Sequence, residues 1–211
     1  MEKMGIGDFL HFGFENAKKH FFKFFGSILL SVVFLGVLAG IGFALNEGLG
    51  VLLLLVGIIS VSMGFMQNII LLAKGESFDL KAFIPQPAVF LNYFIAMMIV
   101  SIVVAIGLAL LVIPGLILGV MFSLVPYLIL DQKMGAIEAI KESMSRTKGH
   151  KNDIFWGLIV SNIVASLLST FVITLFFTTP MLYFISAYPY LRLTGKLELI
   201  PDEEETIVVN E

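Results

Sequence analysis

The chain has 211 residues, of which 58% are hydrophobic and only 14% charged, and its formal net charge at pH 7 is −3. Soluble domains carry about 25% charged residues, so this composition, with a mean hydropathy of +0.99, indicates an integral membrane protein. Because cysteine is absent, disulfides, thiolate chemistry and cysteine metal sites are excluded. The basic residues form no large patch, so no nucleic-acid partner is expected.

Residues 7–25 are expected to form an amphipathic helix in the membrane interface, with Asp8 as its N-cap. Its lysines would face lipid headgroups, and the helix would serve as a simple anchor or, alternatively, as a lipid-sensing element. The segment has no small-residue cleavage site, so the apolar run after it is expected to be retained as a span. The apolar stripe of this helix consists of Leu10, Phe14, Ala17, Phe21 and Phe24.

Two membrane spans are predicted next, at residues 26–45 and 51–73, with a turn at residues 46–50. Each approximates the roughly 20 apolar residues that a bilayer core requires. Small residues four positions apart let helices approach closely in lipid, which predicts packing inside the chain, with a dimer face as the alternative. These pairs are Gly36 with Gly40 and Ser60 with Gly64.

A second hairpin is predicted from spans at residues 93–113 and 115–130. Pro cannot continue a helix and Gly permits a tight reversal, so Pro114 and Gly115 are expected at the tip of this hairpin. A third hairpin is predicted from spans at residues 154–175 and 177–193.

The division of the third hairpin is placed near Thr178-Thr179-Pro180, the only break that its sequence offers. After it, residues 201–211 form an acidic tail that is expected to be disordered. The polar side chains of the fifth span are expected to bond to neighbouring helices. They are Ser161, Asn162, Ser166 and Ser169.

Polar segments precede the second and third hairpins as well. Residues 74–92 predict a short interfacial helix that ends at Pro85 and Pro87. Residues 131–153 predict a longer amphipathic helix that lies under the bundle and stops at Gly149. The expected apolar stripe of this longer helix consists of Met134, Ile137, Ile140 and Met144.

The orientation follows from the basic residues. All 13 Lys and Arg lie within residues 3–23, 74–81, 133–151 and 192–196, and the predicted outer turns contain none. The positive-inside rule then places both termini in the cytoplasm, which requires an even number of spans. The sequence predicts an all-α, six-helix transmembrane bundle of three hairpins, each preceded by an amphipathic interfacial segment, as one domain over residues 1–200.

A repeat marks the even-numbered spans. Spans four and six end in S-x-x-P-Y-L-x-L-x-x-K, and span two ends in L-x-x-K. Each proline frees a carbonyl four residues earlier, a deficit that the serine three residues before it could relieve. Such kinked helices could surround a polar cavity near the inner leaflet, or a duplicated hairpin could have kept its kink and anchors for packing. The candidate cavity or kink residues are Gln67, Asn68, Ser123, Pro126, Tyr127, Ser186, Pro189 and Tyr190.

Residue types that support catalysis or ion transport are missing from the predicted spans. No ionisable side chain lies in a span core, where it would usually mark an ion or proton pathway. His11 and His20 are expected at headgroup level and His150 in a loop, without metal-ligand spacing. Hydrolase, zinc-protease and nucleotide-binding motifs are absent, so no enzyme activity, cofactor or metal is expected.

One set of residues is shared with a known family, and it consists of Ile113-Pro114-Gly115, Pro126, Asp131-Gln132-Lys133-Met134-Gly135, Ala139-Ile140, Ser143 and Thr147-Lys148-Gly149. Through them, residues 90–157 resemble a bacterial family of membrane domains. Some members are fused to glycerophosphodiester phosphodiesterases, and others are stand-alone inner-membrane proteins of the YciC type. The resemblance implies a polytopic helical protein of the cytoplasmic membrane. No phosphodiesterase domain is attached here, so that activity is not carried over, and the fusion suggests only work near lipid headgroups.

These features favour a lipid-associated scaffold or accessory subunit without catalytic activity. Its expected partners are membrane lipids and a protein at the cytoplasmic face. A small transporter or lipid-handling protein with a polar cavity is the alternative, and an intramembrane enzyme would need a nucleophile and base that the sequence does not offer.

Overall fold

The computed structural model describes residues 4–84, 86–168 and 172–196, and the regular structure of these residues is entirely helical. Four stretches are long and apolar enough to cross a membrane: α1 (Ile6–Leu45), α2 (Glu47–Ala73), α3 (Pro87–Leu110) and Val112–Gln132. The last stretch comprises α4 (Val112–Met121) and α5 (Val125–Gln132). The predicted helical class and membrane character are therefore confirmed, and the chain is a multi-pass membrane protein.

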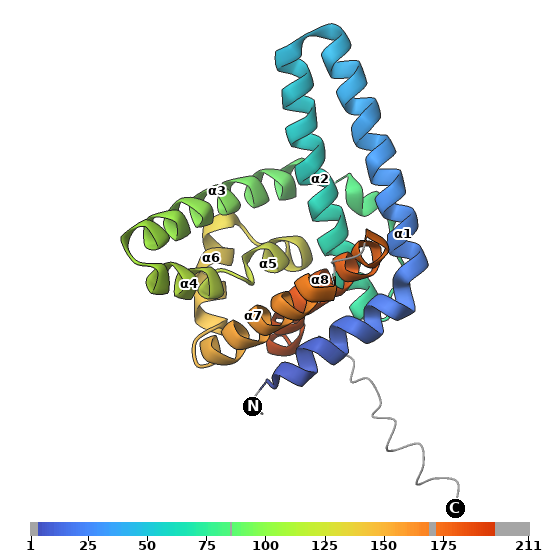
Figure 1. The fold of residues 1–211 in the computed structure, drawn as a ribbon. Coiled ribbons are helices and arrows are strands. Elements are labelled where there is room, and N and C mark those ends of the chain that lie inside the picture. The colour runs from blue at the N-terminus through green and yellow to red at the C-terminus, as the bar shows by residue number, and fades with distance from the viewer. Residues whose placement is uncertain (1–3, 85, 169–171, 197–211) are drawn as a thin grey trace, which may run out of the picture.

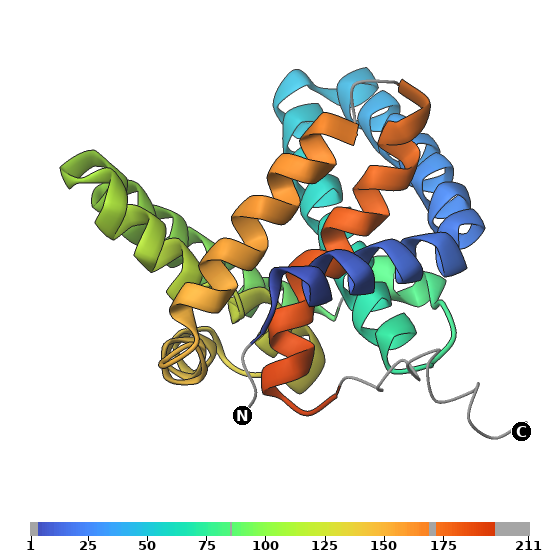
Figure 2. The same cartoon turned by 60° about the horizontal axis from the view of Figure 1, so that its bottom comes forward.

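The helices form adjacent pairs that splay apart from a common base. The pairs are α1 with α2, α3 with α4, and α7 (Lys151–Leu168) with α8 (Val172–Leu193), and they point in different directions in Figure 1. In Figure 2 the turns of the first two pairs lie on one side of the molecule. On the opposite side, which we call the base, lie α5, α6 (Ala136–Arg146) and the start of α1. The 3-10 helix η1 (Leu80–Phe83) connects α2 to α3.

The first interfacial segment and the first span are one bent helix, α1, and not two elements. Gly5 is its N-cap, and Asp8 lies one turn further on, where its carboxylate accepts a hydrogen bond of 2.8 Å from the Gly5 N–H. Asp8 therefore caps the helix from inside the first turn and not from the predicted N-cap position.

The buried face of α1 differs in part from the predicted stripe. Ala17 and Phe24 are buried, but Phe14 is exposed. His20, which was expected at headgroup level, is only 8% exposed and stacks on Phe184 of α8. The face turned inward packs against α2, α7 and α8, and it consists of Phe9, Phe12, Gly13, Ala17, His20, Phe24, Ser27 and Ser31.

Glycines allow helices to approach closely, but only some of them lie at the predicted positions. Of the predicted glycines, Gly64 packs closely within the chain, since a Cβ there would lie 2.9 Å from the Cα of Phe83 in η1. A Cβ on Gly42 of α1 would lie 2.6 Å from the Cα of Gly50 on α2, and a Cβ on Gly107 of α3 would lie 3.0 Å from the Cα of Gly115 on α4. Gly36 and Gly40 have no neighbour within 4 Å of the place that a Cβ would take, so they do not pack within the chain. For this pair a dimer face remains a prediction.

The second hairpin reverses before Pro114 and Gly115. Helix α3 ends at Leu110 and α4 begins at Val112, so the reversal lies at Leu111, whose backbone is extended (φ −156°, ψ 136°). Pro114 lies in the first turn of α4, where a helix has no N–H bond to lose. Gly115 lies against α3, so its missing side chain allows the two helices to pack closely and is not needed for a turn.

The stretch predicted as one span, residues 115–130, is divided by a turn at residues 122–124. Pro126 lies in the first turn of α5 and so begins a new helix instead of kinking an old one. The Phe122 carbonyl that the proline leaves free accepts a bond of 3.1 Å from the Val125 N–H. The predicted kink is therefore a break between two helices.

Helix α6 buries its small residues, contrary to the predicted stripe. Ala136, Ala139 and Ser143 are buried, while Ile137 and Met144 are exposed. The Ser143 hydroxyl donates to the Met121 carbonyl at the end of α4, at 2.6 Å. These small side chains let α6 lie close to α3 and α5. The stripe prediction was wrong for Ile137 and Met144, whereas Met134 and Ile140 are partly buried against the core.

Helix α8 runs without interruption through Thr178-Thr179-Pro180, where the turn of the third hairpin was predicted. A proline inside a membrane helix is tolerated when neighbouring groups satisfy the freed backbone. On α7, Asn162 and Ser166 donate to carbonyls of their own helix, those of Leu158 and Asn162, each at 2.7 Å. The Asn162 amide therefore bonds within its own helix and not to a neighbouring one as predicted. Ser169 and the acidic tail lie outside the described residues.

Candidate functional site

The ends of α2, α5 and α8 share one backbone feature at the base. Each of these helices is followed by a residue in the left-handed region: Gly75 (φ 77°), Lys133 (φ 56°) and Gly195 (φ 67°). The Glu76 and Lys196 N–H groups bond back to the helices at 2.9 and 3.0 Å, which is how such C-terminal motifs satisfy the last carbonyls. The left-handed residue lies after the lysine of L-x-x-K at Gly75, on the lysine itself at Lys133 and before the lysine at Gly195, so the three helix ends are similar but are not in the register of the repeat.

Asp131 lies at the centre of these helix ends. Its side chain is only 8% exposed, and each carboxylate oxygen has a lysine partner: Lys74 from the end of α2 on Oδ1 and Lys196 from beyond α8 on Oδ2. The Tyr190 hydroxyl also donates to Oδ2. One carboxylate therefore links the second helix of the first pair, α5, and the second helix of the third pair.

Aromatic and hydroxyl groups continue this network into the protein. The rings of Tyr127 and Tyr190 stack with their centroids 5.5 Å apart. The Tyr127 hydroxyl lies 2.7 Å from Ser186 Oγ, which donates to the Tyr183 carbonyl. The Gln132 amide donates to the Tyr190 hydroxyl oxygen at 3.2 Å. We call the whole set the Asp131 junction: Lys74, Tyr127, Asp131, Gln132, Ser186, Tyr190 and Lys196.

The charges of the Asp131 junction largely compensate one another. A buried carboxylate is tolerated when it is paired and its lone pairs are hydrogen-bonded, and here two ammonium groups and a phenol satisfy Asp131. The two lysines outnumber the single acid, so the junction carries one net positive charge. Each carboxylate oxygen therefore has at least one partner within the protein, Lys74 on Oδ1 and Lys196 with Tyr190 on Oδ2.

The predicted cavity residues fall into two groups. Tyr127, Ser186 and Tyr190 are brought together in the Asp131 junction. Pro126 and Pro189 are buried beside these tyrosines in the chain, and Ser123 donates to the Val120 carbonyl of its own helix at 2.8 Å. Both repeat serines therefore bond to carbonyls three residues back, and not to the carbonyls that the prolines free.

Asn68 holds a loop in place. It is fully buried, and its side-chain amide donates to the Asp79 carbonyl at 3.0 Å while its carbonyl oxygen accepts from the Asp79 N–H at 2.7 Å. The same amide donates to the Gly64 carbonyl at 2.9 Å. The amide group is thus saturated by backbone and fixes the loop before η1. The neighbouring Gln67 is half-buried.

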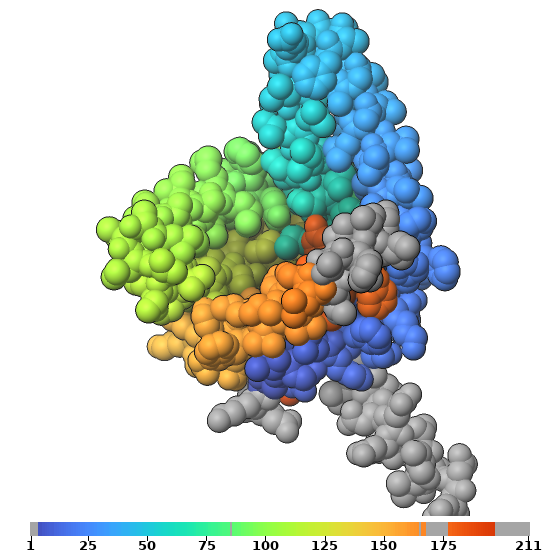
Figure 3. All heavy atoms as spheres, in the orientation of Figure 1, coloured from blue at the N-terminus to red at the C-terminus, as the bar shows by residue number. Residues whose placement is uncertain are grey.

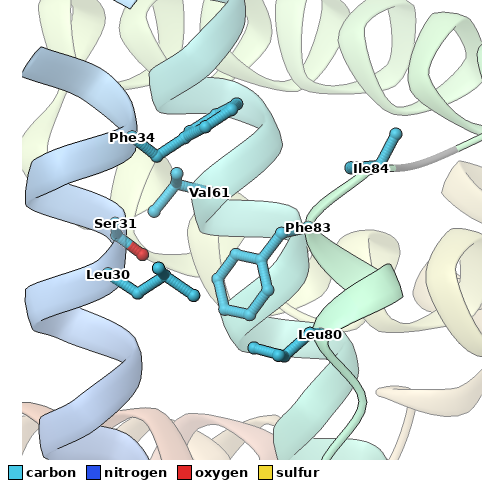
Figure 4. Close-up of a pocket in the computed structure, with 7 residues that line it drawn as sticks. All are labelled: Leu30, Ser31, Phe34, Val61, Leu80, Phe83 and Ile84. Atoms are coloured by element: carbon cyan, nitrogen blue, oxygen red, sulfur yellow. The ribbon is translucent and has the colours of Figure 1, made fainter. Parts of the chain in front are cut away.

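An apolar pocket opens elsewhere, between α1, α2 and η1 (Figure 4). Its only polar lining side chain is Ser31, whose hydroxyl donates to the Ser27 carbonyl at 2.7 Å. None of the eight candidate cavity residues lines this pocket. The lining residues are Leu30, Ser31, Phe34, Val61, Leu80, Phe83 and Ile84.

Comparisons of the chain with protein-family models, with curated proteins and with solved structures give no match. Among the residues that the structure describes, no three His, Asp or Glu side chains are grouped so that they could hold a metal ion. The Asp131 junction and the apolar surfaces of the hairpins are therefore what the chain itself offers for an argument about function.

Sequence reasoning missed Asp131 and the role of two lysines. The sequence pattern favours membrane anchors for the lysines of the repeat and a solvated or capping role for Asp131. A usable signal was present, because Asp131 directly follows the P-Y-L-x-L part of one repeat copy and the corresponding position of the other copy is Thr194. If the ends of the repeated helices are expected to lie close together, a single acid among their lysines predicts an ion pair that several helices share.

Proposed function

We propose that this protein is a non-catalytic, lipid-associated scaffold or accessory subunit of the cytoplasmic membrane, with both termini in the cytoplasm. In this arrangement α7 and α8 also cross, which gives six crossings in three hairpins. The positive-inside distribution of the 13 basic residues supports the orientation. The resemblance of residues 90–157 to bacterial membrane domains supports the choice of membrane.

One observation carries the proposal: the polar side chains at the base are used to hold helices together. The Asp131 junction joins three helix ends, and Asn68 is saturated by the backbone of a loop. A transporter of polar solutes needs polar groups that face a cavity. The described pocket of Figure 4 is instead lined almost wholly by apolar side chains.

The apolar pocket and the splayed hairpins favour the alternative of a lipid-handling protein over that of a solute transporter. Large apolar side chains such as Phe22, Val32 and Leu110 are exposed on the hairpins, where lipid chains would cover them. Such surfaces suit a protein that organises lipid, and they would also suit one that moves lipid between leaflets.

Reconstitution separates these two functions. The full chain is inserted into vesicles that contain a fluorescent phospholipid, and a membrane-impermeant reductant then bleaches the label in the outer leaflet. A scaffold leaves about half of the label protected, as in protein-free vesicles. Bleaching of nearly all of the label, with the vesicles still sealed to a soluble dye, contradicts the scaffold function and favours lipid handling.

A further inference from the structure

A second opening, the α4–α7 groove, lies between two hairpins. Its α4 wall consists of Ile113, Leu116, Ile117 and Val120, and its α7 wall of Lys151, Asn152 and Phe155. Figure 3 shows the surface hollowed between the α3–α4 pair (green) and α7 (orange). The groove is therefore bounded by side chains that come from separate parts of the sequence.

The α4 wall is an apolar track that runs outward from the base. Its four residues lie at helical spacing on one face of α4 and span about 10 Å along the helix, at 1.5 Å per residue. Val120, near the base, is 8% exposed, and Ile113, near the reversal at Leu111, is 72% exposed. The groove is thus deepest at the base and opens toward the far end of the hairpin.

The end of the groove nearest the base is polar and basic. Lys151 and Asn152 begin α7, where the first N–H groups of a helix have no helical partner and favour anions. The Lys151 ammonium makes no ion pair or hydrogen bond with other described residues. One acid, Asp153, lies in the same first turn of α7, and no ion pair joins it to Lys151 among the described residues.

We propose that the α4–α7 groove binds an anionic phospholipid of the cytoplasmic leaflet. Its phosphate lies against Lys151 and Asn152, and one acyl chain lies along the apolar wall of α4. Both ends of the ligand are needed for this match, because a soluble anion would leave the apolar wall uncovered and a neutral lipid would leave Lys151 without a partner. The inference rests on the proposed lipid association and names the lipid class and the residues that select it.

The chain contains its own probe for this site. Trp156 is the single tryptophan, and its ring lies 5.4 Å from that of the groove residue Phe155. The full chain is reconstituted in phosphatidylcholine vesicles to which brominated phosphatidylglycerol or brominated phosphatidylcholine is added at equal mole fraction. Bromine quenches tryptophan at short range, so the quenching of Trp156, which is exposed beside the groove, measures how often each lipid lies next to this part of α7. The part of the preference that depends on Lys151 and Ile117 is the part due to the groove.

We expect brominated phosphatidylglycerol to be preferred about fivefold over brominated phosphatidylcholine, since one lysine near an anionic headgroup has an effect of this size. The preference disappears in Lys151→Gln and is reduced in Ile117→Phe, which fills the groove. It persists in the matched controls Lys141→Gln on α6 and Ile106→Phe on α3, both at exposed positions outside the groove. Helical content by circular dichroism checks that each variant is folded.

Three results overturn the groove proposal. The first is equal quenching by both lipids, and the second is an unchanged preference in Lys151→Gln. The third is loss of the preference when inorganic phosphate is added but not when chloride is added at the same ionic strength, which indicates a site for a free anion. In all three cases quenching by lipid still places α7 in the membrane, so the proposed function stands. If neither lipid quenches Trp156, α7 does not contact the bilayer and the six-crossing proposal fails as well.

Discussion

At the scale of single residues, one carboxylate has more influence on the fold than any other polar group described above. Asp131 binds a lysine from each of two other helices and accepts from Tyr190. These contacts are close to the protein surface, because Lys74 and Lys196 remain partly exposed. Their free energy is therefore smaller than that of a fully buried pair, but all of it depends on one side chain.

Asp131→Asn should destabilise the protein by about 2–3 kcal/mol, less than the roughly 3–5 kcal/mol lost when a fully buried pair is broken. Two ammonium groups would then face each other without a carboxylate between them. For a chain of this size such a loss lowers the melting temperature by roughly 5–10 °C, as measured by circular dichroism in a mild detergent.

Glu138→Gln on α6 is the matched control for this measurement, since it removes one negative charge at an exposed position of the base. It should shift the melting temperature by no more than about 1–2 °C, as is usual for exposed charges. Equal shifts for the two variants would show that net charge, and not the Asp131 junction, stabilises the base.

At the scale of helices, the sequence was sufficient to predict where the apolar helices lie but not which face each one buries. The runs 26–45 and 51–73 fall within α1 and α2 because length and apolar content decide a span. The stripes on α1 and α6 were inferred from the rule that large apolar residues turn inward. In a membrane protein that rule weakens, because lipid solvates large apolar side chains as well as a protein interior does, while close helix packing favours small residues such as the buried Ala139 and Ser143.

The same limit applies to the candidate site. The repeat singled out Tyr127, Ser186 and Tyr190 as candidate cavity or kink residues, and the structure brings these three side chains together. The repeat did not reveal that these positions converge on Asp131, since convergence depends on how the hairpins dock. The turns of the second and third hairpins could not be located from the prolines either. Pro114 lies in the first turn of a helix and Pro180 lies inside one, and both positions tolerate proline.

Two glycines of α4 should respond to alanine in opposite ways. A Cβ at Gly115 would lie 2.5 Å from the backbone nitrogen of Leu108, so Gly115→Ala must push α3 and α4 apart and should cost about 1–3 kcal/mol. A Cβ at Gly119 has nothing within 4 Å, so Gly119→Ala should stabilise the helix by about 0.5–1 kcal/mol. Melting temperatures in detergent give the sign of each effect, and a stabilising Gly115→Ala would contradict the close α3–α4 contact.

At the scale of the whole molecule, the charged base and the apolar hairpins lie at opposite ends. The Asp131 junction, α6 and the start of α7 contain the basic helix ends. The turns at Asn46 and Leu111 lie away from them (Figure 2). This separation is what a membrane protein needs if all of its hairpins enter from one side, because lysine and arginine resist passage across the bilayer.

The absence of cysteine makes that arrangement directly testable, since any single cysteine introduced is the only thiol in the chain. Cysteines replace Glu47 and Leu111 at the two described turns, Ser145 on the exposed side of α6, and Thr170, which separates α7 from α8 in the sequence. A maleimide that cannot cross membranes should label positions 47, 111 and 170 in cells whose outer envelope has been made permeable. It should label position 145 only after the cytoplasmic membrane is permeabilised as well. If positions 145 and 47 are labelled under the same condition, α6 and the turn of the first hairpin lie on the same side of the membrane, contrary to the proposal. If position 170 is protected, α7 and α8 do not cross and the number of crossings is four.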